Sequence, residues 1–248
     1  MDMSSYYSEM TEKALDGYKR INKTDQVEHK KYEVPNATWD VQVVRGKVLE
    51  KATVTSVKLK TKHPITGDDT QFHALQSKVY PANPKIPILV FIIEHMLAQD
   101  DFFSGMMDVI SPVPIEEDLS FLGAEMKKVA EKHGEDYEPL RDKGAQIFKL
   151  DPWEKPINAG VGIHNPTGKE RVEMIKEEGQ VWLSSYLQVV EKRINEPFTD
   201  EDVEKMNAIH ARILEYYYLG DISLPEAMKL GIPLEAINLM LLAPTIRY

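Results

Sequence analysis

The sequence predicts an α+β protein, a three-layer α/β/α sandwich in which one antiparallel sheet lies between helices. Three observations predict it: strand-like alternation over residues 39–80, a strongly apolar stretch at 88–97, and helical periodicity over most of the chain from residue 114 onward. Strands that follow one another and then give way to helices indicate antiparallel pairing rather than βαβ units. The apolar stretch needs cover on both faces, so we expect helices on each side of the sheet.

The composition limits the classes of protein and site to consider. The 248 residues are 42% hydrophobic, enough for one core, and we expect a single domain over 1–248. A net charge of −10 argues against nucleic acid or an anionic membrane surface as the partner. The absence of cysteine excludes thiolate catalysis and thiolate metal sites, and the seven histidines show no metal-ligand spacing. A polar N-terminus, with no apolar run of the ~20 residues that a membrane span needs, predicts a cytoplasmic protein.

The expected elements follow from the spacing of apolar residues. A helix is expected at residues 5–21 and a polar loop at 22–40. Alternation predicts three strands within 39–80, the second and third joined by a turn at 63–69. The remaining predicted elements are strands at 88–97, 102–112 and 157–166, and helices at 114–134, 169–194, 199–219 and 233–242.

A proline-rich connector joins two of the predicted strands. Pro81, Pro84 and Pro87 lie in "KVYPANPKIPILVF", and none of them can donate a ladder hydrogen bond. We therefore expect a rigid segment at 81–87, here called the proline connector. Our interpretation is that it frames the mouth of a pocket.

Three polar side chains occur among apolar neighbours. His210 falls within the inward stripe of the helix 199–219, where it either makes a core hydrogen bond or faces a cavity. Asp108 follows two methionines near a strand end, where it is either a cap for backbone amides or a proton donor. Glu94, on the apolar strand, either reaches solvent or needs a buried partner.

A glycine-rich segment, "GVGIHNPTG", superficially suggests a phosphate-binding loop. It lacks the spacing and the Lys-Ser/Thr ending of a nucleotide loop. We do not expect it to bind a phosphate by that mechanism.

Four stretches together resemble the ferredoxin-dependent bilin reductases. They are "VYPANPKIPILVF", "FFSGMMDVISPVP", "DPWEKPINAGVGIHNP" and "SYLQVVEK", and they follow one another at that family's spacing. The resemblance covers roughly residues 45–244. It implies an antiparallel sheet between helices, with a tetrapyrrole held between the sheet and the helices of one side.

Nearly the same stretches resemble oxygen-dependent coproporphyrinogen oxidase. "EKATVT" from Glu50 corresponds to that family's "EKAGVN", and "PANPKIP" has the same proline spacing as its connector. "EED" from Glu116 and "HGEDYEP" from His133 also match its pattern. The fold that this second resemblance implies is similar.

The chain departs from both families at positions that carry chemistry. Gln76 and Ile92 stand where phycocyanobilin-forming reductases have a histidine and an aspartate. Tyr80 and Ala82 stand where the oxidases have histidine and arginine, and Ala159 replaces another of their arginines. The oxidases' run of arginines on the penultimate helix is reduced to Arg212, so this chain lacks side chains on which the known chemistry of each family depends.

The leading hypothesis is a divergent, phycocyanobilin:ferredoxin oxidoreductase-like bilin reductase of phycobilin biosynthesis. It would reduce biliverdin or a similar linear tetrapyrrole with ferredoxin electrons and without a tightly bound cofactor. The resemblance implies Asp108 as proton donor and His210 as a second one. The implied substrate-binding residues are Gln76, Lys78, Tyr80, Asn83, Glu94, Arg212 and Arg247. The alternatives are a coproporphyrinogen oxidase-like enzyme that performs oxidative decarboxylation, a non-catalytic tetrapyrrole-binding protein, and a retained fold with another ligand.

Overall fold

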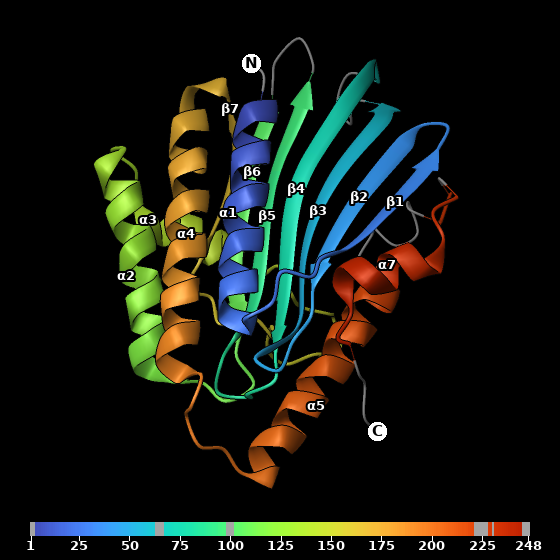
Figure 1. Ribbon diagram of the computed structural model, residues 1–248. Helices are drawn as coiled ribbons and strands as arrows, with labels where there is room; N and C mark the ends of the chain where they lie inside the picture. The colour runs from blue at the N-terminus through green and yellow to red at the C-terminus, as the bar shows by residue number, and fades with distance from the viewer. Residues whose placement is uncertain (1–2, 63–66, 98–101, 221–227, 230, 245–248) are drawn as a thin grey trace.

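The computed structural model describes residues 3–62, 67–97, 102–220, 228–229 and 231–244. It confirms the predicted α+β class: an antiparallel sheet lies between helices (Figure 1). Arg247 and most of the turn expected at 63–69 lie outside the described residues. Within the described ranges, no helix is long and apolar enough to cross a membrane.

Within the described residues, seven strands form the sheet in chain order, and each pairs antiparallel with the next. They are β1 (Glu28–Val34), β2 (Ala37–Val44), β3 (Leu49–Lys62), β4 (Asp69–Pro81), β5 (Ile88–Leu97), β6 (Phe102–Ile110) and β7 (Ile163–Gly168). The proline connector joins β4 to β5, as expected. In β5, residues 88–91 and Ile93 are buried, which agrees with the prediction of a strand covered on both faces.

One layer of helices covers what we call the front face of the sheet, turned toward the viewer in Figure 1. The layer consists of α1 (Ser4–Asn22), α2 (Glu116–Lys132) and α4 (Val172–Arg193), with α3 (Tyr137–Gly144) beside α2 and β7. Its apolar side chains pack with Val54, Leu75, Phe91 and Met107 in the largest core cluster. These residues follow the two-residue period of the strands, so their neighbours in sequence point to the opposite face.

The opposite, back face carries α5 (Asp200–Glu215), the π-helical turn η2 (Tyr216–Gly220) and α7 (Leu234–Leu241). Ile213 and Tyr217 pack with Tyr80 and Val90 in one cluster. Ala236, Ile237 and Met240 of α7 pack with residues of β2 and β3 in another. The expected helix 199–219 therefore ends earlier, at Glu215, and continues as η2.

Two sequence predictions fail at the borders of the sheet. Residues 28–34, "EHKKYEV", form the edge strand β1 rather than part of a loop, and the whole strand is exposed or half-buried. A charged edge strand lacks the apolar alternation that reveals a strand, and its charges discourage pairing with another chain. Residues 158–162, expected within a strand, form a loop before β7, because their backbone amides turn toward Asp108.

Candidate functional site

The strand register aligns side chains in rows across the back face. Thr53 of β3 stands opposite Lys78 of β4, which stands opposite Val90 of β5, and that residue faces Asp108 of β6. The next row toward one end of the sheet holds Lys51, Tyr80, Ile88 and Ile110. Toward the other end lies a row with Thr55, Gln76, Ile92, Met106 and His164. Polar and apolar side chains therefore alternate on this one surface.

Lys78 is buried on the back face and meets aromatic side chains of the covering layer. Its Nζ donates a 2.8 Å hydrogen bond to the hydroxyl of Tyr217 in η2. The same nitrogen lies 4.9 Å and 4.8 Å from the ring centroids of Phe148 and Tyr217. Cation–π contact of this kind keeps a buried ammonium compatible with an apolar surface.

Tyr80 and His210 pack against each other between β4 and α5. Their ring centroids lie 5.5 Å apart, edge to face, and both side chains are buried. Burial raises the pKa of Tyr80, and its hydroxyl donates to the carbonyl oxygen of Leu241. The inward position expected for His210 is confirmed, and the imidazole belongs to a packed interface.

Asp108 is fully buried, and its carboxylate accepts bonds from a loop 50 residues away. Oδ2 accepts from Asn158 Nδ2 at 2.6 Å and from the Gly160 amide at 2.9 Å. Oδ1 accepts from the Val109 amide at 2.8 Å and from the amides of Val161 and Gly162 at 3.3 Å. The glycine-rich segment thus does surround an anion, which is a side chain of the same protein.

The chemistry of this arrangement follows from its donors. Burial raises the pKa of Asp108, while the bonds from Asn158, Val109, Gly160 and Val161 oppose that rise. Each donor needs a lone pair on the carboxylate, so the contacts fit the ionised form. A Cβ on Gly162 would lie 1.7 Å from the carbonyl oxygen of Met107, so only glycine allows this close approach. The geometry favours the capping role over the proton-donor role.

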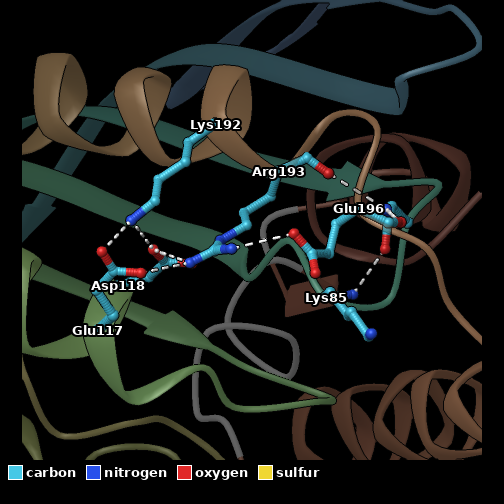
Figure 2. Close-up of polar contacts among 7 residues, drawn as sticks. Lys85, Glu117, Asp118, Lys192, Arg193 and Glu196 are labelled. Carbon is cyan, nitrogen blue, oxygen red and sulfur yellow. Dashed lines mark hydrogen bonds and ion pairs between the residues drawn. The ribbon is translucent and has the colours of Figure 1, made fainter.

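Asn83, in the proline connector, reaches the end of α4 in the front layer. Its Nδ2 donates to the carbonyl oxygens of Arg193, the last residue of α4, and of Glu196, at 3.3 and 2.8 Å. Arg193 binds Asp118 through Nε at 2.8 Å and Glu196 through Nη1 at 3.0 Å (Figure 2). The connector therefore contacts the end of α4 directly and α2 through Arg193. These contacts lie on the front side of the sheet, whereas Lys78 and Tyr80 lie on the back face.

The other expected binding residues are placed less centrally. Gln76 and Glu94 are half-buried on the back face, in the rows beyond Lys78. Arg212 stacks on Trp153, with its Cζ 4.3 Å from the ring centroid, and donates to the carbonyl of Lys155. Within the residues that the structure describes, no three His, Asp or Glu side chains form a metal site.

Two back-face residues were missed by the sequence reasoning. Lys51 is buried, and its Nζ donates to the carbonyls of Asn238 and Leu242. His164 is half-buried, its Nε2 lies 3.4 Å from Ser104 Oγ, and burial together with Lys143 lowers its pKa. Lys51 could have been found, because it lies within the "EKATVT" stretch and shares the strand period with Thr53.

Comparison with known proteins settles the family. The sequence model described as "Coproporphyrinogen III oxidase" matches residues 2–248. The chain belongs to this family. Oxygen-dependent coproporphyrinogen-III oxidase of Coxiella burnetii (strain Dugway 5J108-111) is 28% identical over 198 residues, which cover 75% of this chain and 63% of the relative. The enzyme of the same name from Rickettsia bellii (strain RML369-C) is 24% identical over 225 residues, 84% of this chain and 80% of the relative.

This membership corrects the leading hypothesis from the sequence. The interpretation as a ferredoxin-dependent bilin reductase of phycobilin biosynthesis is wrong, because the family and the relatives are coproporphyrinogen oxidases. Biliverdin and ferredoxin lose their support with it, since the relatives are named as oxygen-dependent. Of the two resemblances, the one carried by "EKATVT" and "PANPKIP" was the better guide.

Proposed function

We propose that this protein binds a carboxylate-bearing cyclic tetrapyrrole on the back face of its sheet and oxidises it with O2. The observation that carries the proposal is a pair of buried lysines, Lys51 and Lys78, on that face of a chain that belongs to the coproporphyrinogen III oxidase family. They come from neighbouring strands and occupy adjacent rows. Two buried amines on one surface are suited to two carboxylates of one ligand, whose negative charge favours the ammonium form of each lysine.

The apolar part of the same face supports the macrocycle in this proposal. Val90 lies in the same row as Lys78, and Ile92 and Met106 lie in the adjoining row. A flat ring system gains most from such a surface, while a few polar groups set its orientation. Gln76 and Glu94, half-buried at the margin, are proposed to contact polar atoms of the ligand.

The proposed reaction is oxidative decarboxylation, in which a propionic acid side chain loses CO2, two protons and two electrons and becomes a vinyl group. O2 takes up the two electrons and two protons and is reduced to H2O2. Asp108 is proposed to hold the loop 158–162 in place rather than to donate a proton, since five N–H donors already face its oxygens. His210 is proposed to position Tyr80 through their ring contact.

A second candidate function, tetrapyrrole binding without turnover, is favoured by one specific observation. Ala82 and Ala159 stand at positions where the oxidases carry arginine, so fewer cations are available for carboxylates. A protein with this deficit can bind a tetrapyrrole and still fail to hold a propionate for decarboxylation.

One experiment tests both candidates. Purified protein is given coproporphyrinogen III, made anaerobically, and then air, and the products are separated by chromatography. Binding is measured in parallel by the absorbance change of coproporphyrin III. Vinyl-bearing product supports the oxidase, and binding without product supports the second candidate.

Lys78→Met is expected to weaken binding about 10-fold or more, whereas Lys60→Met, which changes an exposed lysine of β3, is the matched control. Absence of binding in the wild-type protein contradicts both candidates.

A further inference from the structure

Three side chains of the sheet hold the last turn of α7. Lys51 Nζ donates to the carbonyl oxygens of Asn238, at 3.2 Å, and of Leu242. Tyr80 donates to the carbonyl of Leu241. The Thr53 hydroxyl, which also contacts the carbonyl of Lys78, lies 3.3 Å from the carbonyl of Met240. We call Lys51, Thr53 and Tyr80 the carbonyl clasp.

The clasp lies on the surface that also carries Lys78. Lys51 stands opposite Tyr80 in the β3–β4 register, and Thr53 stands opposite Lys78. All four side chains are buried. The carbonyl oxygens of α7 therefore occupy one end of the patch on which the proposed tetrapyrrole would lie.

The electrostatics of Lys51 are unusual for a buried cation. Among the described residues it meets carbonyl oxygens and the Tyr80 ring, 5.2 Å away, and it has no carboxylate partner. Burial, Arg45 and Lys78 lower its pKa to about 7, against a smaller opposite effect of Glu28. Buried ammonium groups are normally paired with an acid. Neutral carbonyl oxygens accept the hydrogen bonds of Lys51 here, although carboxylate oxygens would accept them more strongly.

We propose that Lys51, Thr53 and Tyr80 form a carboxylate subsite, for which the last turn of α7 competes with a ligand carboxylate. The inference rests on the proposed function, because it takes a tetrapyrrole carboxylate as the competing occupant. A carboxylate accepts stronger, charge-assisted bonds from Lys51 than a carbonyl does. Ligand binding and α7 docking then exclude each other at this point.

The apolar side of α7 sets the strength of this competition. Ala236, Ile237 and Met240 pack against Trp39 and neighbouring residues of β2 and β3. Moving the last turn away exposes part of this surface, which opposes ligand binding. Weakening the helix without touching the clasp should therefore raise the affinity for the ligand.

The test variant is Leu234→Gly combined with Asn238→Gly. Both side chains are exposed and one helical turn apart, so the helix is weakened while its buried side chains and carbonyl groups are kept. Affinity for coproporphyrin III is expected to rise about 10- to 30-fold over wild type. The same pair of glycines with Lys51→Met is expected to lose that gain. The matched control is Lys127→Gly with Glu131→Gly, at the same spacing on the exposed side of α2.

The outcomes separate the two proposals. A gain that depends on Lys51 supports the subsite. Wild-type binding with no gain, or a loss, in the α7 variant overturns the subsite and leaves the proposed function standing. If neither wild type nor any variant binds coproporphyrin III, the proposed function fails and the subsite falls with it.

Hydrogen exchange of the wild-type protein gives a readout that needs no variant to fold. Saturating coproporphyrin III is expected to speed exchange of the α7 amides. Slower exchange there on binding would mean that α7 closes over the ligand, and would overturn the competition.

Discussion

The two faces of the sheet bury different kinds of side chain: the front face packs in the larger apolar cluster, whereas the back face buries two lysines and an aspartate. The buried polar side chains of the front include Ser77, His95 and Asn165, together with Glu178 of α4, whose carboxyl lies near Asn165. On the back, Lys51, Lys78, Tyr80 and Asp108 all have specific partners. The front layer therefore mainly supplies apolar cover for the sheet. The buried charged side chains that make specific hydrogen bonds lie on the back face.

Loss of the Asp108 carboxylate is expected to have the largest effect on stability. Asp108→Asn removes a charge that accepts five bonds and brings an NH2 group toward N–H donors. The free energy of unfolding should fall by about 2–4 kcal/mol, measured by urea denaturation. Asp151→Asn, an exposed acid, is the control and should change it by less than about 0.5 kcal/mol. A stable Asp108→Asn protein with normal loop geometry would show that the Asp108 carboxylate is not needed to hold the loop 158–162.

Glu178 sharpens the comparison through pH. Burial raises its pKa to about 8, so the folded protein holds a proton that the unfolded chain releases above about 4.5. The contribution of Glu178 to the free energy of unfolding is fully present below its pKa in the unfolded chain. It is lost as the pH rises toward 8, by up to about 1.4 kcal/mol per pH unit. Glu178→Gln should remove this fall in thermal denaturation at pH 5 to 8.5. Glu173→Gln, an exposed change on the same helix, should keep it. An unchanged slope in Glu178→Gln would place the carboxyl in contact with water.

Lys51 should give the opposite slope on the back face. Its pKa is lowered to about 7, so between about 7 and 10.5 the unfolded chain binds the proton that the folded protein lacks. Stability from this group should rise with pH across that window. The carbonyls of the clasp favour the ammonium, so the rise should be smaller than that of a bare buried lysine. Lys51→Met should flatten it, and Lys60→Met should not. If both variants follow the wild-type profile, the carbonyls fully offset the burial of the charge.

The sequence predicts the faces of the sheet better than the contacts across them. Period-two alternation places Gln76, Lys78 and Tyr80 on one surface, and the structure agrees, because side-chain direction is local. The loop partners of Asp108 lie 50 to 54 residues further on, and the acceptors of Lys51 lie 187 and 191 residues away. No local spacing reveals such pairs, which depend on strand register and loop closure.

The site residues illustrate where sequence reasoning stops. Asp108 stood out as an acid among apolar residues, but the same pattern suits a donor of protons and an acceptor of backbone amides. Asn83 belonged to a motif shared with tetrapyrrole enzymes, yet its side-chain amide donates to the carbonyl oxygen of Glu196, just beyond α4. The choice between two families of similar fold rested on short motifs, and the whole-chain match decided it.

The strand order has a consequence for how the chain folds during synthesis. Because β1 to β6 are neighbours in chain order and are joined by short segments, each can pair with the strand made just before it, so most of the sheet can grow from short-range contacts. β7 joins later, because α2 and α3 lie between it and β6 in the chain. Neither layer can close that early. α1 is made first yet packs against α4, and Lys51 meets Leu242 only when nearly the whole chain has been made. At about 5–20 residues per second, the growing sheet spends many seconds with its back face open, which is when a nascent chain of this design most needs protection from aggregation.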